Sequence, residues 1–183
     1  RFGREKLVAD TVRVCVEEAN ALPDEHGNPI GAQVLREVEK ISDLRFVFTQ
    51  APYSRCLFGL RNGNADLVLH VPYLAEPGFE SYGIFLNWTV PVKADLVSLD
   101  PAWFAKLDTL GDGRIGVPRG NVEFAALATG IAPRKFQEIT TMKSLVKMLT
   151  LGRIDMVWYD RVSVRQELAA QNVKNAYYYE LPI

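Results

Sequence analysis

The sequence of 183 residues has little of what marks several large classes of protein. No run of Lys or Arg exceeds two residues and the formal net charge is −1, which argues against a nucleic-acid partner. The longest uncharged apolar stretch, residues 81–92, is too short to span a bilayer. The two histidines, His26 and His70, form no His/Cys cluster with zinc-site spacing, so we predict neither a metal nor a cofactor.

Cysteine is scarce as well. Cys15 lies in a predicted strand and Cys56 in a predicted helix, both among apolar residues. We favour two buried free thiols over a disulfide between them. A chain of this size buries roughly 70% of its unfolded surface, so its core needs no disulfide. The sequence opens at Arg1 without a signal peptide, from which we expect a processed or trimmed form.

One pattern is present twice. In each copy two apolar residues stand three apart, a glycine follows after three residues, and an aspartate follows after three more. The copies are Leu57-x-x-Leu60-x-x-Gly63-x-x-Asp66-x-Val68 and Val146-x-x-Leu149-x-x-Gly152-x-x-Asp155-x-Val157. They are offset by 89 positions (146 minus 57).

Each part of this pattern has a local structural meaning. Apolar residues three apart form the inner face of a last helical turn, and the glycine suits the left-handed position just past a helix end. The apolar run after the aspartate is typical of a buried parallel strand. We therefore predict one helix–glycine–strand unit in each half, with interior strands at 65–70 and 154–158 in two separate sheets. Two such lobes imply a cleft between them, where a small molecule binds by default.

The rest of the sequence alternates between strand and helix patterns. In the first half we expect strands at 11–16 and 44–49, a helix that buries Val34, Val38 and Ile41, and a second helix capped by Ser54. In the second half we expect strands at 113–117, 136–139 and 154–158, and helices at 121–128, 142–151 and 160–171. Residues 89–99 and 177–181 are predicted to be extended.

Several acidic residues are candidates for functional groups. Asp66 and Asp155 each precede a strand, and we interpret them as turn-stabilising residues outside any site rather than as a catalytic pair. Glu17 and Glu18 follow the first strand at its carboxyl end, where open α/β sheets bind ligands. His70 ends a buried strand and is predicted to line the cleft.

A second group of candidates lies at the start of helices and beside strand ends. Arg119 and Asn121 open a helix after a glycine, where free N–H groups favour an anion. Tyr53 and Tyr73 are candidates for stacking on a ligand. Asp160 is either the N-cap of the last helix or a ligand contact, and both roles are compatible only if one carboxylate oxygen is left for the ligand.

Three segments in this order and spacing carry a resemblance to a known family. They are APYSRCLFGLRNGNADLVL (51–69), LGDGRIGVPRGN (110–121) and LGRIDMVWYD (151–160). Together they resemble the bacterial extracellular solute-binding proteins of family 3, the periplasmic receptors of amino-acid-type ABC importers. The resemblance implies an α/β fold of the periplasmic-binding-protein type II, with a doubly wound, mostly parallel sheet in each of two lobes and two crossover strands between them.

The resemblance also implies boundaries. It places lobe 1 at 1–91, lobe 2 at 92–178 and the start of a return strand at 179–183, with the C-terminal return to lobe 1 missing. Hinge closure is expected around 89–99 and 176–181.

The resemblance assigns roles to individual residues. It places Asp160 where relatives bind the ligand's amino group, 118–121 where they contact its carboxylate, and Tyr53 where they carry an aromatic. The arginine that clamps the carboxylate in amino-acid binders is missing, since no arginine lies between Arg61 and Arg114. We therefore expect a small polar, amine-bearing solute rather than a standard α-amino acid.

The function that the resemblance implies is binding without catalysis. We expect a monomeric solute-binding protein, periplasmic or lipid-anchored outside the cytoplasm, that serves an ABC permease. The alternative is the extracellular ligand-sensing domain of a signalling protein. An enzyme on this fold, such as a dehydratase or a regulatory lobe of a lytic enzyme, would need an acid–base pair such as Glu17 or Glu18 with His70.

Overall fold

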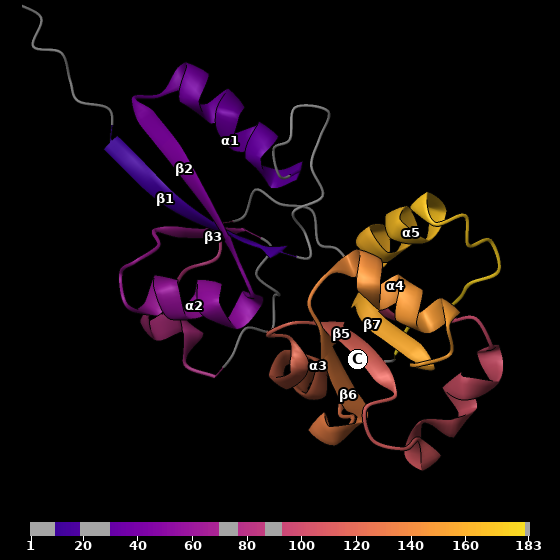
Figure 1. Cartoon of the computed structure of the whole chain (residues 1–183). Coiled ribbons are helices and arrows are strands. Elements are labelled where there is room, and N and C mark those ends of the chain that lie inside the picture. The colour runs from indigo at the N-terminus through magenta and orange to yellow at the C-terminus, as the bar shows by residue number, and fades with distance from the viewer. Residues whose placement is uncertain (1–9, 19–29, 70–76, 87–92, 182–183) are drawn as a thin grey trace, which may run out of the picture. The chain divides into compact units, whose positions relative to one another are not determined.

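Two separate β-sheets organise the chain. The computed structural model describes residues 10–18, 30–69, 77–86 and 93–181. The described residues up to 69 form one unit and those from 77 onward form a second (Figure 1). Each unit has its own sheet with helices packed against it, so the predicted α/β class with mostly parallel sheets is confirmed.

The first unit is built on a three-stranded parallel sheet in the order β2-β1-β3. Its elements are β1 (Asp10–Glu17), α1 (Ile30–Ile41), β2 (Leu44–Ala51), α2 (Tyr53–Arg61) and β3 (Leu67–Leu69). Val14 and Val16 of β1 pack with Leu35 of α1. Cys15, which points to the other face, packs with Cys56 of α2. The two helices therefore cover opposite faces of the sheet, as Figure 1 shows.

Helix α1 forms where the sequence predicts it, but of the predicted buried residues only Val38 packs against the core, and it is partly buried. The side chains that are buried are Ala32 and Leu35, whereas Val34 and Ile41 are exposed by 46% and 86%. Apolar spacing defines a stripe along a helix and does not tell which edge of the stripe meets the sheet. Here the sheet covers the side that is centred on Leu35.

The predicted cap of α2 is also wrong. The helix begins at Tyr53, with Pro52 as the N-cap residue and no capping side chain. The Pro52 carbonyl oxygen accepts hydrogen bonds from the amides of Arg55 and Cys56 at 2.9 and 3.0 Å. Because the helical bonds start there, Ser54 lies inside the first turn rather than ahead of it.

The second unit has a five-stranded mixed sheet in the order β6-β5-β7-β4-β8. Its strands are β4 (Ala94–Ser98), β5 (Ile115–Pro118), β6 (Phe136–Ile139), β7 (Met156–Asp160) and β8 (Tyr177–Tyr179). Its helices are η2 (Phe79–Ser81), η3 (Pro101–Thr109), α3 (Val122–Thr129), η4 (Pro133–Lys135), α4 (Met142–Thr150) and α5 (Arg161–Ala170). Strand β5 runs parallel to β6 and β7, whereas β4 is antiparallel to β7 and β8.

The extended segments join this second sheet. Residues 94–98, predicted as part of a connection, form the buried strand β4 between β7 and β8, while residues 87–92 lie outside the described part. Strand β8 pairs with β4, with Tyr178 opposite Val97. None of the helices in the described ranges has the length and apolarity that crossing a membrane requires.

The two copies of the repeat fold into the same local structure, as predicted. Gly63 and Gly152 have φ angles of +69° and +64°, just past the ends of α2 and α4. Their amides donate to the carbonyls of Leu60 and Leu149 at 3.2 and 3.1 Å. The residue after each glycine donates to the carbonyl five positions earlier, at 2.8 and 2.9 Å. Both helices therefore end in a Schellman motif.

The strands that follow the two motifs match the prediction of interior parallel strands only in part. Strand β7 is interior, and it runs parallel to β5 but antiparallel to β4. Strand β3 is three residues long and, among the described residues, pairs only with β1, so it lies at the end of the described sheet.

Candidate functional site

The carboxyl ends of three parallel strands meet at one edge of the second sheet. The register pairs Ile115 of β5 with Phe136 of β6 and with Met156 of β7. The chain therefore leaves β5, β6 and β7 at neighbouring positions along this edge. In open α/β sheets ligands bind outside the carboxyl ends of the strands, so this edge is the candidate binding site of the unit.

Asp160, the last residue of β7, is the most informative side chain at this edge. It is the N-cap of α5, and its Oδ1 atom accepts a hydrogen bond from the Ser163 amide at 2.8 Å. Its Oδ2 atom is buried, and no donor among the described residues bonds it. The predicted capping role is therefore confirmed, and one oxygen remains for another donor. A buried acceptor left unbonded costs roughly 1–3 kcal/mol, which a ligand donor would recover.

The loop between β5 and α3 carries the two residues that were expected to favour an anion. Arg119 is exposed and Asn121 is buried. The backbone amides of this loop, however, already have acceptors within the protein. The Arg119 amide donates to the Ile139 carbonyl at 3.1 Å and the Asn121 amide donates to the Pro118 carbonyl at 3.1 Å.

Between these two amides lies a third donor, the amide of Gly120. Gly120 has a φ of +83°, and its amide donates to Oε1 of Glu138 on β6 at 2.9 Å. The anion that meets this loop is therefore a carboxylate of the protein itself. Sequence reasoning missed Glu138, because only the pairing of β6 with β5 brings the residue to the loop.

Arg161, the residue after Asp160, is bound to carboxylates other than that of Asp160. Arg161 donates through Nε and Nη2 to the buried carboxylate of Asp95 on β4, the latter bond at 2.9 Å. These hydrogen bonds raise the pKa of Arg161. Glu180 accepts from Lys93 at 2.5 Å and lies 3.5 Å from Arg161, and these contacts lower the pKa of Glu180. The charge of Arg161 is thus balanced by the carboxylates of Asp95 and Glu180.

The predicted residues of the first unit gather at the carboxyl edge of its own sheet. Glu17 ends β1 opposite Ala51 of β2, and Tyr53 follows two residues later at the start of α2. Glu17 and Tyr53 are buried and Glu18 is half-buried. That they share one groove with Arg119, Asn121 and Asp160 stays a prediction. Tyr73 and His70 lie outside the described residues.

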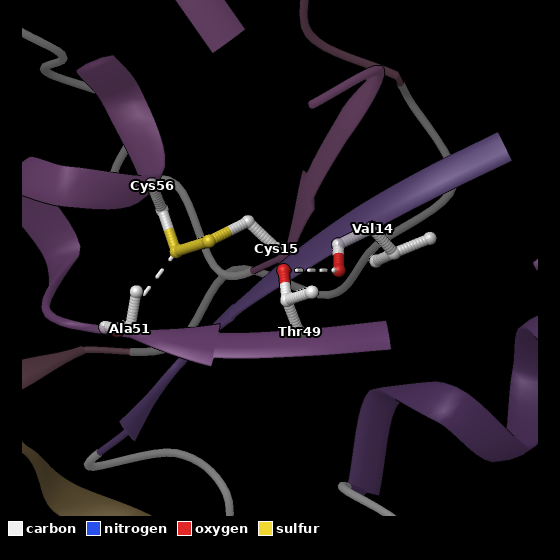
Figure 2. The surroundings of a disulfide bond; sticks show 5 residues. All are labelled: Val14, Cys15, Thr49, Ala51 and Cys56. Atoms are coloured by element: carbon white, nitrogen blue, oxygen red, sulfur yellow. Dashed lines mark hydrogen bonds between the residues drawn. A yellow bond between two sulfur atoms is a disulfide. The ribbon is translucent and has the colours of Figure 1, made fainter. Parts of the chain in front are cut away.

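Cys15 and Cys56 form a disulfide, so the preference for free thiols was wrong (Figure 2). The bond joins β1 to α2 across 41 positions, with the Cα atoms 5.4 Å apart. Cys56 Sγ also lies 3.8 Å from the Ala51 carbonyl oxygen, which is a packing contact because a bonded sulfur has no hydrogen to donate. The sequence does not reveal the pairing, since only the packing of α2 on β1 brings the two side chains together.

Asp66 and Asp155 lie at the amino ends of β3 and β7, away from the edge with the candidate residues. Each binds a distant arginine rather than its own turn: Arg13 lies in β1, and Arg114 directly precedes β5. Asp66 accepts from the guanidinium of Arg13 at 2.7 and 2.9 Å, and Asp155 accepts from that of Arg114 at 2.5 and 2.6 Å. The amide of each aspartate donates to the carbonyl of the same arginine at 2.8 Å. The two aspartates are therefore structural residues, but they stabilise an ion pair with a distant arginine rather than their own turn as predicted.

Solved structures of similar fold match nearly the whole chain. A substrate-binding protein of an ABC uptake transporter from Streptococcus pneumoniae, with bound histidine, matches at a TM-score of 0.72 and 16% identity, over 94% of this chain and 75% of that one. An ancestral arginine-binding protein bound to glutamine matches at 0.72 and 17%, over 94% and 79%. The VFT2 domain of BvgS from Bordetella pertussis matches at 0.64 and 21%, over 94% and 76%.

These likenesses establish the fold. At such identities they show that the chain has the α/β fold of the periplasmic-binding-protein type II. No protein-family model matches the chain, and no curated protein matches it by sequence. The neighbours described above are binding proteins and a signalling-protein domain rather than enzymes.

Proposed function

We propose that the protein is a solute-binding receptor that captures a small polar, amine-bearing solute, with Asp160 as the residue that binds the amine. The observation that carries this proposal is the buried Oδ2 atom of Asp160, which has no donor among the described residues. An ammonium or guanidinium group supplies the missing donor together with a compensating charge. Arg161, the neighbouring cation, is already balanced by Asp95 and Glu180.

The partner in this proposal is the membrane permease of an ABC importer, and the protein acts outside the cytoplasm. Support comes from neighbours that are described as a substrate-binding protein of an ABC uptake transporter and as an arginine-binding protein. The disulfide between Cys15 and Cys56 fits an oxidising compartment. Monomeric behaviour and closure around the solute belong to the same proposal.

A sensing role is the second candidate. The observation that favours it is the likeness to a BvgS domain at 21% identity, and a regulatory domain of OxyR2 from Vibrio vulnificus also matches, at a TM-score of 0.58. Both candidates need the same solute site and differ in the partner that recognises the bound form. Catalysis is not part of either proposal.

Asp160→Asn tests the site directly. Asparagine keeps an oxygen that can cap α5 and removes the negative charge. We expect a solute found by thermal-shift screening of amino acids, polyamines, organic acids and short peptides to bind the variant more weakly by about 1–3 kcal/mol in calorimetry.

The matched control is Asp100→Asn, because Asp100 is also an N-cap in the second unit and accepts from the Ala102 amide at 2.9 Å. This control is expected to bind like the wild type. Unchanged affinity in Asp160→Asn, or a solute without a basic group, would contradict the assignment.

A further inference from the structure

We infer that Glu138 determines which amines the second unit accepts: its carboxylate holds the place of a ligand carboxylate, so the site selects amines that carry no neighbouring carboxylate group. This inference rests on the proposed amine site at Asp160 and names the solute class of that site. Candidate solutes are therefore diamines, guanidino-amines and similar cations rather than zwitterionic amino acids.

The loop that Glu138 meets has the features of an anion-binding loop. It leads from the carboxyl end of β5 into α3, a helix of eight residues, and it contains the positive-φ glycine Gly120 and the exposed cation Arg119. Backbone N–H groups at such a helix start attract a negative group. In this protein the negative group is Oε1 of Glu138, 2.9 Å from the Gly120 amide nitrogen.

The other two amides of residues 119–121 also have acceptors within the protein. Those of Arg119 and Asn121 donate to the carbonyls of Ile139 and Pro118. A ligand carboxylate would have to displace Glu138 or lie next to it as a like charge, and both cost binding free energy. The same loop would bind a carboxylate if position 138 carried a neutral side chain.

Glu138 and Asp160 belong to one edge of the sheet. Strand β6 carries Glu138 and β7 carries Asp160, on the two sides of β5. The carboxylates of Glu138 and Asp160 outnumber the one cation of residues 118–121, Arg119, so this edge favours a cation over an anion. Two basic residues lie close in the sequence to these carboxylates, and both bind other groups. Arg161, next to Asp160, donates to Asp95, and Lys135, near Glu138, donates to the Leu110 carbonyl.

Pairs of probes that differ by one carboxylate test the inference. Agmatine is arginine without its carboxylate, and cadaverine is lysine without it. We expect the wild type to bind the better amine at least about tenfold more tightly than its amino acid, the effect of one unfavourable charged contact. Calorimetry on the folded, disulfide-bonded protein measures this ratio.

Glu138→Ala removes the carboxylate and frees the Gly120 amide. We expect the amino acid to gain about tenfold in affinity while the amine changes less, so that the preference collapses. Glu138→Gln, which keeps an oxygen acceptor for Gly120 without the charge, should lie between the two. Glu123→Ala is the control, because Glu123 is an exposed carboxylate on the first turn of α3. It removes the same charge without touching Gly120 and should leave the preference near that of the wild type.

A second readout does not depend on any ligand. Exchange of the Gly120 amide hydrogen should be faster in Glu138→Ala than in the wild type, because its acceptor is gone. Three results would each overturn the role of Glu138 and leave the amine site at Asp160 standing. They are equal affinity of the wild type for amine and amino acid, an unchanged preference in Glu138→Ala, and an unchanged rate of Gly120 amide exchange in that variant. If neither member of a pair binds, or if both bind Asp160→Asn as tightly as the wild type, the amine site itself fails, and the inference fails with it.

Discussion

Each unit has a matching aspartate–arginine pair, and the aspartate of this pair is exposed in the first unit and buried in the second. The side chains of Arg13 and Asp66 are exposed by 49% and 40%, whereas those of Arg114 and Asp155 are exposed by 38% and 6%. Both units share a two-pronged ion pair and an amide-to-carbonyl bond, and in the first unit the Arg13 amide also donates to Oδ2 of Asp66 at 2.8 Å. One local design is therefore used in two environments, and its contribution to stability depends on the burial that each unit provides.

The two units also differ in what else stabilises them. In the part of the first unit that the structure describes, three strands and two small buried clusters are present, and a disulfide joins β1 to α2. The second has five strands, a larger buried cluster and the buried carboxylate of Asp95 bonded to Arg161. Small cores are commonly supported by covalent links, because the apolar area they bury is limited. We therefore expect the first unit to depend on its cross-link more than the second unit depends on any single contact.

The largest expected effect comes from removing the disulfide. The double variant Cys15→Ala/Cys56→Ala should destabilise the first unit by about 4 kcal/mol, the loop-closure value for a separation of 41 residues. Hydrogen exchange followed by mass spectrometry should show the loss in residues 10–69 and much less in 93–181. Reductant should destabilise the wild type in the same region and have no effect on the variant. A uniform loss across both units would contradict the comparison.

Neutralising the buried aspartate should matter more than neutralising the solvated one. Asp155→Asn is expected to cost about 2 kcal/mol, because hydrogen bonds to a charged group in a buried setting are lost. Asp66→Asn should cost clearly less, since water screens its pair with Arg13. Chemical denaturation of the two variants, with hydrogen exchange measured separately in each unit, gives the loss in the free energy of unfolding for each variant. Equal costs would show that burial does not control this pair.

The two repeat glycines should respond alike. At both Gly63 and Gly152 an added Cβ atom meets nothing within 4 Å, so the cost of an alanine comes from the positive φ angle alone. Gly63→Ala and Gly152→Ala should each destabilise their own unit by about 1 kcal/mol. Thermal or chemical denaturation of the single variants measures this loss of stability. A large difference between them would mean that the helix ends are not equivalent.

The smallest expected effect is a pH dependence in the first unit. Hydrogen bonds from Arg13 lower the pKa of Asp66 from 3.8 to about 2. Because the folded pKa lies below the ordinary value, the stabilising contribution is complete above about pH 4 and is lost as the pH falls toward 2. Acid titration of stability should therefore be flatter between pH 4 and 2 in Asp66→Asn than in the wild type. Parallel titration curves would contradict this.

Elements that depend on neighbouring residues could be predicted from the sequence. The left-handed glycines after α2 and α4, the apolar strands that follow, and the cap at Asp160 are all set within about six positions of chain. The repeat of this local chemistry at an offset of 89 was enough to predict two α/β units. Errors arose where a local rule left a choice open, as with the buried face of α1 and the start of α2.

Contacts between distant residues could not be predicted from the sequence, because they depend on how the elements pack. The disulfide, the Arg13–Asp66 and Arg114–Asp155 pairs and the bond from Gly120 to Glu138 join residues 18 to 53 positions apart. The unbonded oxygen of Asp160 is likewise a property of its packed surroundings. Such contacts form because strand pairing and helix packing bring side chains together, and the spacing of residues along the chain does not encode which partners will meet.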